Sequence, residues 1–320
     1  VGGQDELVFD GGSMIIDQEG TICQHAGFCN EALLPIDIEI TSANTVVSRT
    51  AFTLPSEEQR IYDVLVLGVR DYIEKNNFPG VLVGVSGGID SALTLAIAVD
   101  ALSKEKVHAV MMPSRFTSEM STEDSLALIN NLGVTHDVIS IEPAFNSFLD
   151  SLKPFLADKK PDITEENIQS RCRGVILMAL SNKTGKLVLT TGNRSELAVG
   201  YATLYGDMAG GFAVLKDVSK TLVYRLAHFR NQLGPVIPSR IITRAPTAEL
   251  APNQKDEDCI PPYEILDKIL ELYLNQEQSL ENIVEQGFDR DVVTKVINLV
   301  CKSEYKRRQS AIGARVNHKA

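Results

Sequence analysis

The run from Val81 to Ser91 constrains the fold more than any other part of the sequence. Its first five residues, Val81-Leu82-Val83-Gly84-Val85, form an almost continuous apolar run, which is typical of a strand buried on both faces of a sheet. The segment Ser86-Gly87-Gly88-Ile89-Asp90-Ser91 follows, and Ala92 to Leu102 has the composition of a helix. A buried strand, a glycine turn and a helix predict the start of a parallel βαβ unit.

The same alternation continues along the chain and predicts the fold class. We expect an α/β fold, a doubly wound, mostly parallel sheet with helices on both faces, followed by a helical C-terminal part. The expected strands are 107–112, 138–141 and 187–190, and the expected helices are 56–76, 121–132, 167–180, 218–233, 263–274, 280–286 and 289–305. The segment 235–262 is rich in proline and acidic residues in its second half, which favours an exposed loop.

Residues 1–45 have a different character. Short strands are expected at 6–9, 13–17 and 34–40, and a segment of this size is too small to build an independent core. We therefore expect two parts, a β-rich remnant over 1–45 and a main domain over 46–320, with a polar linker at 41–50. Because the chain begins without methionine inside a strand-rich segment, it is expected to be a piece of a longer polypeptide.

Composition narrows the class of protein. A net charge of -11 argues against a broad nucleic-acid-binding surface, which needs clustered Lys and Arg. The five cysteines form no Cys-x-x-Cys pair and no zinc-ligand spacing with histidine, so reduced thiols are expected. No apolar run approaches the ~20 residues that cross a bilayer, and no signal peptide is present, which favours a soluble, cytoplasmic protein without a membrane partner.

The glycine turn has the chemistry of a phosphate-binding loop. Small residues let the backbone approach anionic oxygens, and the N–H groups and dipole at a helix N-terminus favour an anion there. The loop lacks the lysine of Gly-x-x-x-x-Gly-Lys-Ser/Thr, which lowers support for kinase-like transfer. A glycine turn that merely lets a helix pack on its strand is the alternative.

The loop resembles the pyrophosphate-binding loop of the N-type ATP pyrophosphatases, and further segments narrow the resemblance. Together with the loop, the segments 112–118, 166–173, 190–196 and 246–250 are similar to the synthetase domain of glutamine-dependent NAD synthetases. Residues 1–45 resemble the C-terminal end of the nitrilase-like glutaminase domain that precedes the synthetase in this family. The family's glutaminase catalytic residues lie upstream, so neither Cys23 nor Cys29 is expected to be a nucleophile.

The resemblance implies a set of site residues. Asp90, Lys220 and Glu196 would be catalytic, and Asp90 and Glu196 would hold Mg²⁺. ATP would contact Gly84, Val85, Ser86, Gly87, Gly88, Ile89, Asp90, Ser91, Thr191, Lys220 and Thr247, and deamido-NAD would contact Asn167, Arg171, Glu196 and Lys306. Each has an alternative: Arg171 and the cluster Lys306-Arg307-Arg308 could be solvated helix charges, Thr191 a strand-end residue, and Glu196 a carboxylate favoured by a helix dipole.

The resemblance also implies a ligase that forms a C–N bond. Deamido-NAD would be adenylated by ATP and then amidated by ammonia, with an upstream glutaminase domain as the ammonia source and a homo-oligomer as the assembly. Two alternatives remain: another N-type enzyme, such as a GMP, asparagine, argininosuccinate or tRNA-modifying synthetase, and a nucleotide-binding module without turnover. The glycine-rich segment 204–211 is typical of a lid hinge or of a plain surface loop.

Overall fold

A parallel five-stranded sheet forms the centre of the computed structural model, which describes residues 1–40, 45–47, 50–156, 159–160, 162–252, 254 and 256–317. The strand order is β11-β10-β7-β8-β9, and every neighbouring pair is parallel. The predicted α/β fold with a parallel sheet is therefore confirmed. The strands are β7 (Val81–Val85), β8 (Val107–Met111), β9 (Thr135–Val138), β10 (Leu187–Thr190) and β11 (Phe212–Ala213).

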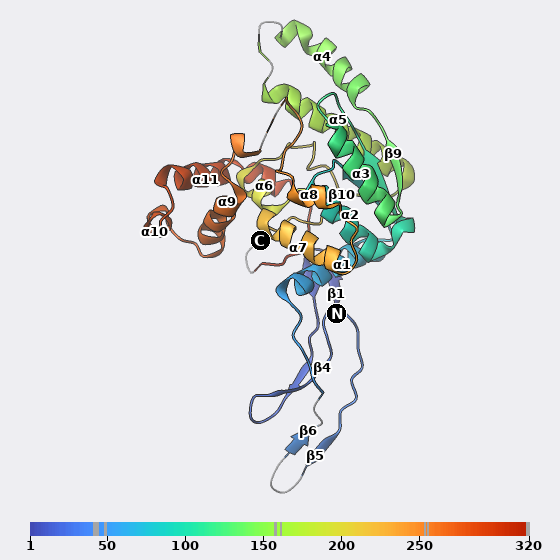
Figure 1. Cartoon of the computed structure of the whole chain (residues 1–320), viewed down its shortest axis with the longest axis vertical. Helices are drawn as coiled ribbons and strands as arrows, with labels where there is room; N and C mark the ends of the chain where they lie inside the picture. Colours follow the sequence, from blue (N-terminus) through green and yellow to red (C-terminus); the bar gives the residue numbers. More distant parts are fainter. Residues whose placement is uncertain are drawn as a thin grey trace.

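The central strand β7 is buried on both faces of the sheet, which explains its continuous apolar run. Val81, Val83 and Val85 belong to a core shared with α1, α2, α3 and α7, while Leu82 belongs to a second core shared with α4 and α5. Figure 1 shows these helices around the sheet. Successive side chains of a strand point to opposite faces, so a strand covered on both sides needs apolar residues throughout. The helices are α1 (Glu57–Lys75), α2 (Ile89–Leu102), α3 (Glu119–Leu132), α4 (Glu142–Leu156), α5 (Ile163–Thr184) and α7 (Lys220–Gln232).

The strand order places a crevice beside the glycine turn. From β7 the chain moves outward through β8 and β9, and it then returns to the other side of β7 as β10. The connections that leave β7 and β10 therefore diverge, and ligands of open α/β sheets bind at such a switch point, outside the carboxyl ends of the strands. The segments 86–88 and 191–193 lie at this position.

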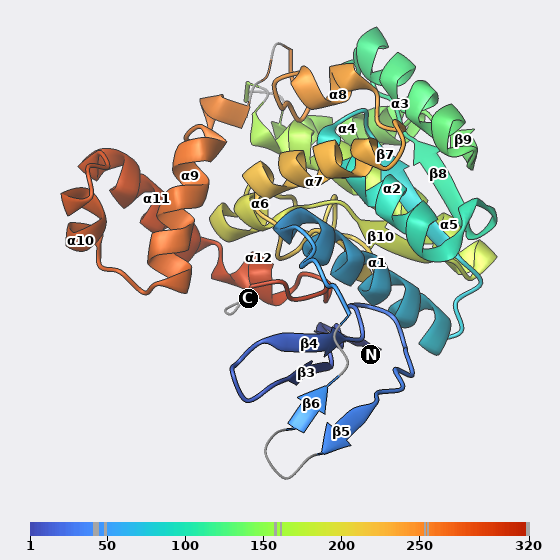
Figure 2. The ribbon, with the colours of Figure 1, turned by 60° about the horizontal axis from the view of Figure 1, so that its bottom comes forward.

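The C-terminal helices form a separate cluster at the side of the sheet (Figure 2). α6 (Arg194–Val199) and α9 (Tyr263–Leu270) share an apolar core with α10 (Leu280–Glu285) and α11 (Arg290–Lys302). α9 continues into a π-helical turn over Glu271–Asn275, and α12 (Glu304–Arg308) follows α11 after Ser303. The predicted C-terminal helices are therefore present, although the last of them is divided in two.

The N-terminal segment extends away from the main body (Figure 1). It forms three antiparallel strand pairs, β1 (Gly2–Gln4) with β2 (Leu7–Phe9), β3 (Met14–Ile16) with β4 (Ile22–His25), and β5 (Ile38–Ile40) with β6 (Thr45–Val47). The amide of Gly3 donates to Asp71 of α1 over 2.7 Å, and Lys75 Nζ donates to the Gly3 carbonyl over 2.6 Å. The predicted domain division at residue 45 stays a prediction.

The C-terminal segment 311–317 joins the N-terminal strands to the sheet. The amide of Ala213 in β11 donates to the carbonyl of Ile312 over 2.7 Å, and the amide of Arg315 donates to the carbonyl of Glu6 over 2.8 Å. The side chain of Ala314 is buried, in contact distance of α1 at Gly68. Residues near both ends of the described chain thus meet beside α1.

Several predicted boundaries were wrong. β9 ends at residue 138, whereas a strand was expected at 138–141, because Ile141 packs as the buried residue before α4, a helix that the sequence analysis did not predict. α8 (Ser239–Thr243) interrupts the expected loop 235–262, since Ile241 and Ile242 are buried in the main core. Of the expected linker 41–50, residues 45–47 form β6, while 41–44 and 48–49 lie outside the described residues.

None of the described helices combines the length and apolarity needed to cross a bilayer. Localisation in the cytoplasm remains a prediction.

Candidate active site

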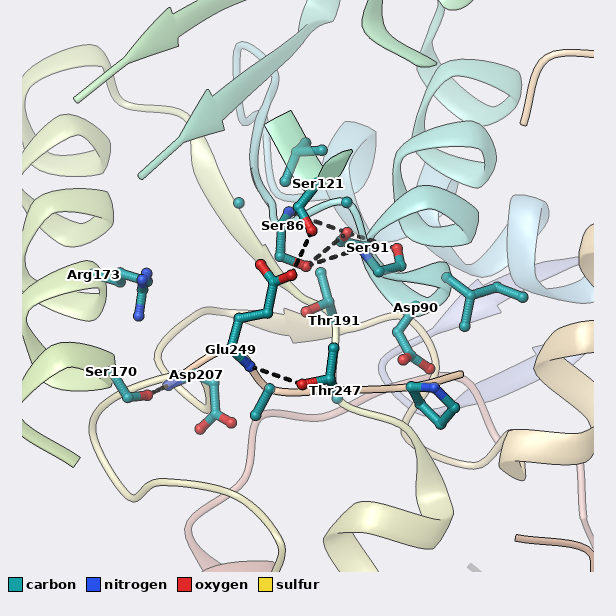
Figure 3. Close-up of a pocket in the computed structure, with 18 of the residues that line it drawn as sticks. Ser86, Asp90, Ser91, Ser121, Ser170, Arg173, Thr191, Asp207, Thr247 and Glu249 are labelled. Atoms are coloured by element: carbon teal, nitrogen blue, oxygen red, sulfur yellow. Dashed lines mark hydrogen bonds between the residues drawn. The ribbon is translucent and has the colours of Figure 1, made fainter. Parts of the chain in front are cut away.

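A cavity of about 280 Å³ opens at the carboxyl ends of β7 and β10. Figure 3 shows residues of its walls: Ser121 of α3 lies above Ser86 and Ser91 of the glycine turn, Glu249 and Thr247 lie below them, and Arg173 of α5 lies at the left. All eight residues from Gly84 to Ser91 line the cavity, as do Thr191, Glu196, Lys220 and Thr247. The structure therefore brings together every residue that the resemblance assigned to ATP and Mg²⁺.

The glycine turn has the geometry of an anion site. Gly87 has a φ of +81°, and a Cβ at this residue would lie 2.6 Å from the carbonyl oxygen of Ser121, so only glycine fits. Gly88 is the N-cap of α2 and offers no side chain to its first amides. Ser91 Oγ lies 3.2 Å from Ser86 Oγ and donates to the Gly88 carbonyl over 2.9 Å. The free amides of the α2 N-terminus therefore remain available to an anionic ligand.

Beside the turn, a buried lysine joins two carboxylates. Lys220 Nζ, at the N-terminus of α7, donates to Asp90 Oδ2 over 2.5 Å and to Glu196 Oε1 over 3.1 Å. The Lys220 side chain is only 3% exposed, and the carboxylates are 16% and 17% exposed. The three groups come from α2, α6 and α7, so the site exists only in the folded chain.

The charges in this group are strongly coupled. Burial raises the pKa of Glu196, and nearby Asp90 and Asp256 act in the same direction, so that it reaches about 7 although Lys220 opposes the shift. Burial disfavours the Lys220 ammonium, but Asp90 and Glu196 outweigh it and hold the pKa of Lys220 above its ordinary value. Lys220 therefore carries a positive charge at neutral pH.

Asn193 connects the two carboxylates, and the sequence analysis did not assign it. Its Nδ2 donates to Asp90 Oδ1 over 2.9 Å, and its Oδ1 accepts from the amide of Glu196 over 3.0 Å. Glu196 Oε2 in turn accepts from the Asn193 amide, which completes a capping box at the start of α6. The spacing Asn193-x-x-Glu196 is the sequence pattern of this motif and could have identified Asn193.

The donor set fits Mg²⁺. Asp90 and Glu196 are hard oxygen donors that reach the cavity next to an anion-binding turn. The described residues contain no cluster of three or more His, Cys, Asp or Glu side chains arranged around a metal position. Mg²⁺ usually keeps several waters and binds through one or two carboxylates together with phosphate oxygens. Two protein carboxylates beside a phosphate site meet that requirement.

The segment 244–250 carries an acidic side chain that the sequence analysis also missed. The carboxylate of Glu249 points toward Ser121, beside Ser86 (Figure 3). Glu249 Oε1 accepts from Ser118 Oγ and Ser121 Oγ, each over 2.8 Å, and from Arg244 Nη2 over 3.0 Å. Thr247 Oγ1 donates to the carbonyl of Gln254 over 2.6 Å. The Glu249 carboxylate therefore accepts the hydrogen bonds that these serine and arginine donors next to the glycine turn could otherwise make to a ligand.

Arg173 and Asp207 are further lining residues. The Arg173 side chain points into the cavity, its Nε donates to the Met112 carbonyl over 3.0 Å, and no carboxylate in the described part of the chain lies within ion-pair distance. Burial lowers the pKa of Arg173 and raises the pKa of Asp207 to about 6. A partly buried cation that faces the cavity without an ion-pair partner among the described residues favours the binding of an anionic ligand there.

Three residues predicted to contact deamido-NAD lie outside the cavity lining and hold the segment after α6. Asn167 Oδ1 accepts from Thr203 Oγ1 over 2.8 Å, and Arg171 Nε donates to the Leu204 carbonyl over 3.2 Å. Lys306 Nζ donates to the carbonyls of Gly200 and Ala202 over 2.7 and 2.6 Å. Their role in substrate binding stays a prediction.

The glycines of 204–211 serve close packing in this structure. A Cβ on Gly206 would lie 2.3 Å from Ser170 Oγ, and one on Gly210 would lie 2.5 Å from Thr190 Cγ2. Asp207 also accepts from the Thr203 amide over 2.7 Å, and its own amide donates to Ser170 Oγ over 2.9 Å. The segment is thus packed against α5 and β10. Its glycines are needed because no side chain fits between these elements, and none of the three has a positive φ.

The fold and the cavity define a parallel α/β nucleotide-binding protein with an anion-binding turn beside two carboxylates and a lysine. The family model for NAD synthase matches residues 61–310, and the chain belongs to this family. It is 53% identical over its whole length to the glutamine-dependent NAD(+) synthetase of Acinetobacter baylyi and 45% identical to that of Thermotoga maritima. It spans 59% and 61% of the lengths of those curated relatives.

Solved structures agree with this assignment. The structure of glutamine-dependent NAD+ synthetase from Acinetobacter baumannii in complex with adenosine diphosphate is 49% identical, with a TM-score of 0.74, and the alignment covers 100% of this chain and 58% of that one. The NMN synthetase of Francisella tularensis is 27% identical with a TM-score of 0.68, over 79% of this chain and 97% of that one.

Proposed function

We propose that this chain carries the ligase activity that converts deamido-NAD to NAD, with ATP cleaved to AMP and pyrophosphate and ammonia as the nitrogen donor. The observation that carries the proposal is the group Asp90, Glu196 and Lys220 beside the glycine turn, because it places a cation and two metal-binding carboxylates where a polyphosphate would bind. Membership of the NAD synthase family and the ADP complex of the Acinetobacter baumannii relative support the same substrate class.

The residues have distinct tasks in the first step. The nicotinate carboxylate of deamido-NAD attacks the α-phosphorus of ATP, and the bond to the departing pyrophosphate breaks. The amides of the α2 N-terminus and the Lys220 ammonium stabilise the charge that develops on the pyrophosphate. Asp90 and Glu196 would hold Mg²⁺, which supplies neutralising charge to the phosphates. The product is an acyl adenylate.

The second step needs no nucleophile from the protein. Ammonia attacks the activated carbonyl, the bond to AMP breaks, and the amide of NAD forms with loss of a proton. The cavity contributes by holding the adenylate in place and by limiting the access of water that would hydrolyse it.

An upstream domain is part of the proposal. The chain spans about three-fifths of its curated relatives, and the N-terminal segment exposes large apolar side chains, including Phe9 at 62%, Leu33 at 97% and Ile40 at 79%. Large apolar side chains exposed along one segment favour a contact with another protein surface. We infer that a glutaminase domain covers it and supplies ammonia in the full-length enzyme.

A homo-oligomer is the proposed assembly. α4 buries only Phe145 completely, while it exposes Phe148 at 50% and Phe155 at 77%, and the adjoining α5 exposes Val175 at 63%. These side chains would be covered in a complex of two copies. Sedimentation velocity is expected to give a species larger than the monomer, and a Val175→Asp variant that sediments like the wild type would contradict a contact through α5.

The test of the proposed function is incubation of the chain with Mg-ATP and deamido-NAD, with ammonium in one sample and glutamine in another. Chromatography is expected to give NAD, AMP and pyrophosphate in equal amounts with ammonium and none with glutamine. AMP without NAD would indicate an N-type ATP pyrophosphatase that acts on a substrate other than deamido-NAD. Absence of both AMP and NAD would contradict the proposed activity of this chain.

Glu249→Gln is expected to tighten the binding of Mg-ATP about five-fold, a difference of roughly 1 kcal/mol. The Glu249 carboxylate occupies donors beside the phosphate turn, so it repels and competes with an incoming polyphosphate. Isothermal titration calorimetry measures the change. Glu123→Gln is the matched control, because this exposed carboxylate of α3 pairs with Arg240 and does not line the cavity. Unchanged or weaker binding by the Glu249 variant would contradict this role.

A further inference from the structure

Helix α9 directs two polar side chains at the active-site cluster. Tyr263 and Asp267 are four residues apart, so they lie on the same face of the helix. The Tyr263 ring centre lies 5.0 Å from Lys220 Nζ, and its hydroxyl donates to Asp256 Oδ2 over 2.9 Å. Leu266 and Ile269 of the same helix are buried in the C-terminal core. α9 is therefore held by the C-terminal helices, while Tyr263 and Asp267 lie next to the active-site residues.

Asp267 connects the starts of the two helices that carry Glu196 and Lys220. Its Oδ2 accepts from the Thr221 amide over 2.8 Å and from Thr221 Oγ1 over 2.7 Å, at the N-terminus of α7. Its Oδ1 accepts from Ser195 Oγ, in the first turn of α6. Thr221 directly follows Lys220 and Ser195 directly precedes Glu196, so one carboxylate contacts both neighbours of the active-site pair.

The same hydrogen-bond network includes the backbone amide of Lys220. Ser195 Oγ donates to Asp267 and accepts from the Lys220 amide over 2.9 Å. Three first-turn amides of α7 are thereby satisfied: that of Lys220 by Ser195, that of Thr221 by Asp267, and that of Leu222 by the N-cap Ser219. The carboxylate also lies at a helix N-terminus, where a negative charge is favourable. Without the Asp267 carboxylate, the first turn of α7 would lose the contacts that hold the Lys220 side chain in its direction.

We propose that Asp267 is a positioning residue, which joins the first turns of α6 and α7 so that Lys220 and Glu196 meet Asp90 in one fixed arrangement. This inference rests on the proposed function and deepens it. Both carboxylate oxygens are needed, since one serves α6 and the other serves α7. An asparagine has nearly the same size but only one acceptor atom, so Asp267→Asn keeps the volume while it removes one of the two acceptors and the negative charge at the α7 N-terminus.

The first experiment compares Asp267→Asn with Asp100→Asn in the whole chain. Asp100 is a matched control, because its carboxylate accepts from Tyr62 Oη and from Arg230 Nε, each over 2.6 Å, and it does not line the cavity. Asp267→Asn is expected to lower kcat with ammonium about 100-fold, with KM for ATP changed less than about threefold. Asp100→Asn is expected to lower the melting temperature while kcat stays near that of the wild type. Equal kcat values for the two variants would overturn the proposal.

A second experiment separates positioning from loss of stability. In an Asp90→Asn background, which lacks the carboxylate that Lys220 is aimed at, Asp267→Asn is expected to reduce kcat by much less than in the wild type. A full, additive loss in that background would overturn the proposal.

A third readout does not depend on activity. Amide hydrogen exchange at Lys220 and Thr221 is expected to become faster in Asp267→Asn and to stay unchanged in Asp100→Asn. Unchanged exchange in Asp267→Asn would refute the proposed network. Faster exchange together with no NAD formation by the wild type would leave the network standing and reject the proposed function, so the two failures are distinguishable.

Discussion

Asp90→Asn is expected to reduce AMP formation from Mg-ATP and deamido-NAD by about 30- to 1,000-fold, or ~2–4 kcal/mol of transition-state stabilisation. The substitution removes one of the two carboxylates available to Mg²⁺ and one partner of Lys220, while Asn193 can still bond to the remaining amide oxygen. The fold is expected to survive, because Asp90 lies at the cavity edge with its side chain 16% exposed. Initial rates over a series of Mg²⁺ concentrations measure the effect.

Glu196→Gln is the companion variant and is expected to show a loss of similar size. Its matched control is Glu166→Gln, a carboxylate of α5 that bonds to Gln254 outside the cavity lining. If either Asp90→Asn or Glu196→Gln retained near-normal turnover at low Mg²⁺, the metal-binding role of that residue would be wrong. Circular dichroism on each variant separates loss of activity from loss of folding.

Lys220→Ala is expected to destabilise the protein by about 3–5 kcal/mol in addition to lowering turnover, because it leaves two carboxylates in a buried site without their counter-charge. Denaturant unfolding in Mg²⁺-free buffer measures this loss. Added Mg²⁺ is expected to restore part of the stability, since a bound cation replaces the missing ammonium.

Lys216→Ala is the control for Lys220→Ala. Lys216 is a partly buried lysine on the preceding segment, and its Nζ donates to the Ala311 carbonyl over 2.8 Å without contacting the carboxylates. The stability of the Lys216→Ala variant is expected to fall less than that of Lys220→Ala and not to depend on Mg²⁺. Equal losses in the two variants, with no Mg²⁺ effect on either, would mean that Lys220 does not balance the charge of this site.

The sequence predicted those features of the fold that depend on local pattern. The continuous apolar run Val81–Val85 predicted a strand buried on both faces, and its bounds are the observed ones. A helix was expected over 56–76, and α1 begins there with Ser56 as its N-cap, whose Oγ accepts from the Gln59 amide over 3.2 Å. The glycine turn was also predicted, because its residues are consecutive and their chemistry is local.

Other features could not be predicted because they depend on residues far apart in the chain. Asp267 contacts Ser195 and Thr221 only after α9 has packed beside α6 and α7, and no spacing in the sequence connects these positions. Glu249 reaches the phosphate turn through a segment that was expected to be an exposed loop. α6 is a six-residue helix, too short for an apolar period to indicate it.

The contacts of the segment 311–317 set an order of events during synthesis. Its backbone bonds both to β11 and to the carbonyl of Glu6, beside the helix on which β1 packs. These residues leave the ribosome long after the sheet strands and the N-terminal strand pairs have been translated. The backbone contact between Arg315 and Glu6 can therefore form only after residue 315 has been translated. A ribosome that stalls within α11 would hold a nascent chain in which the N-terminal strand pairs and β11 are not yet connected through this segment.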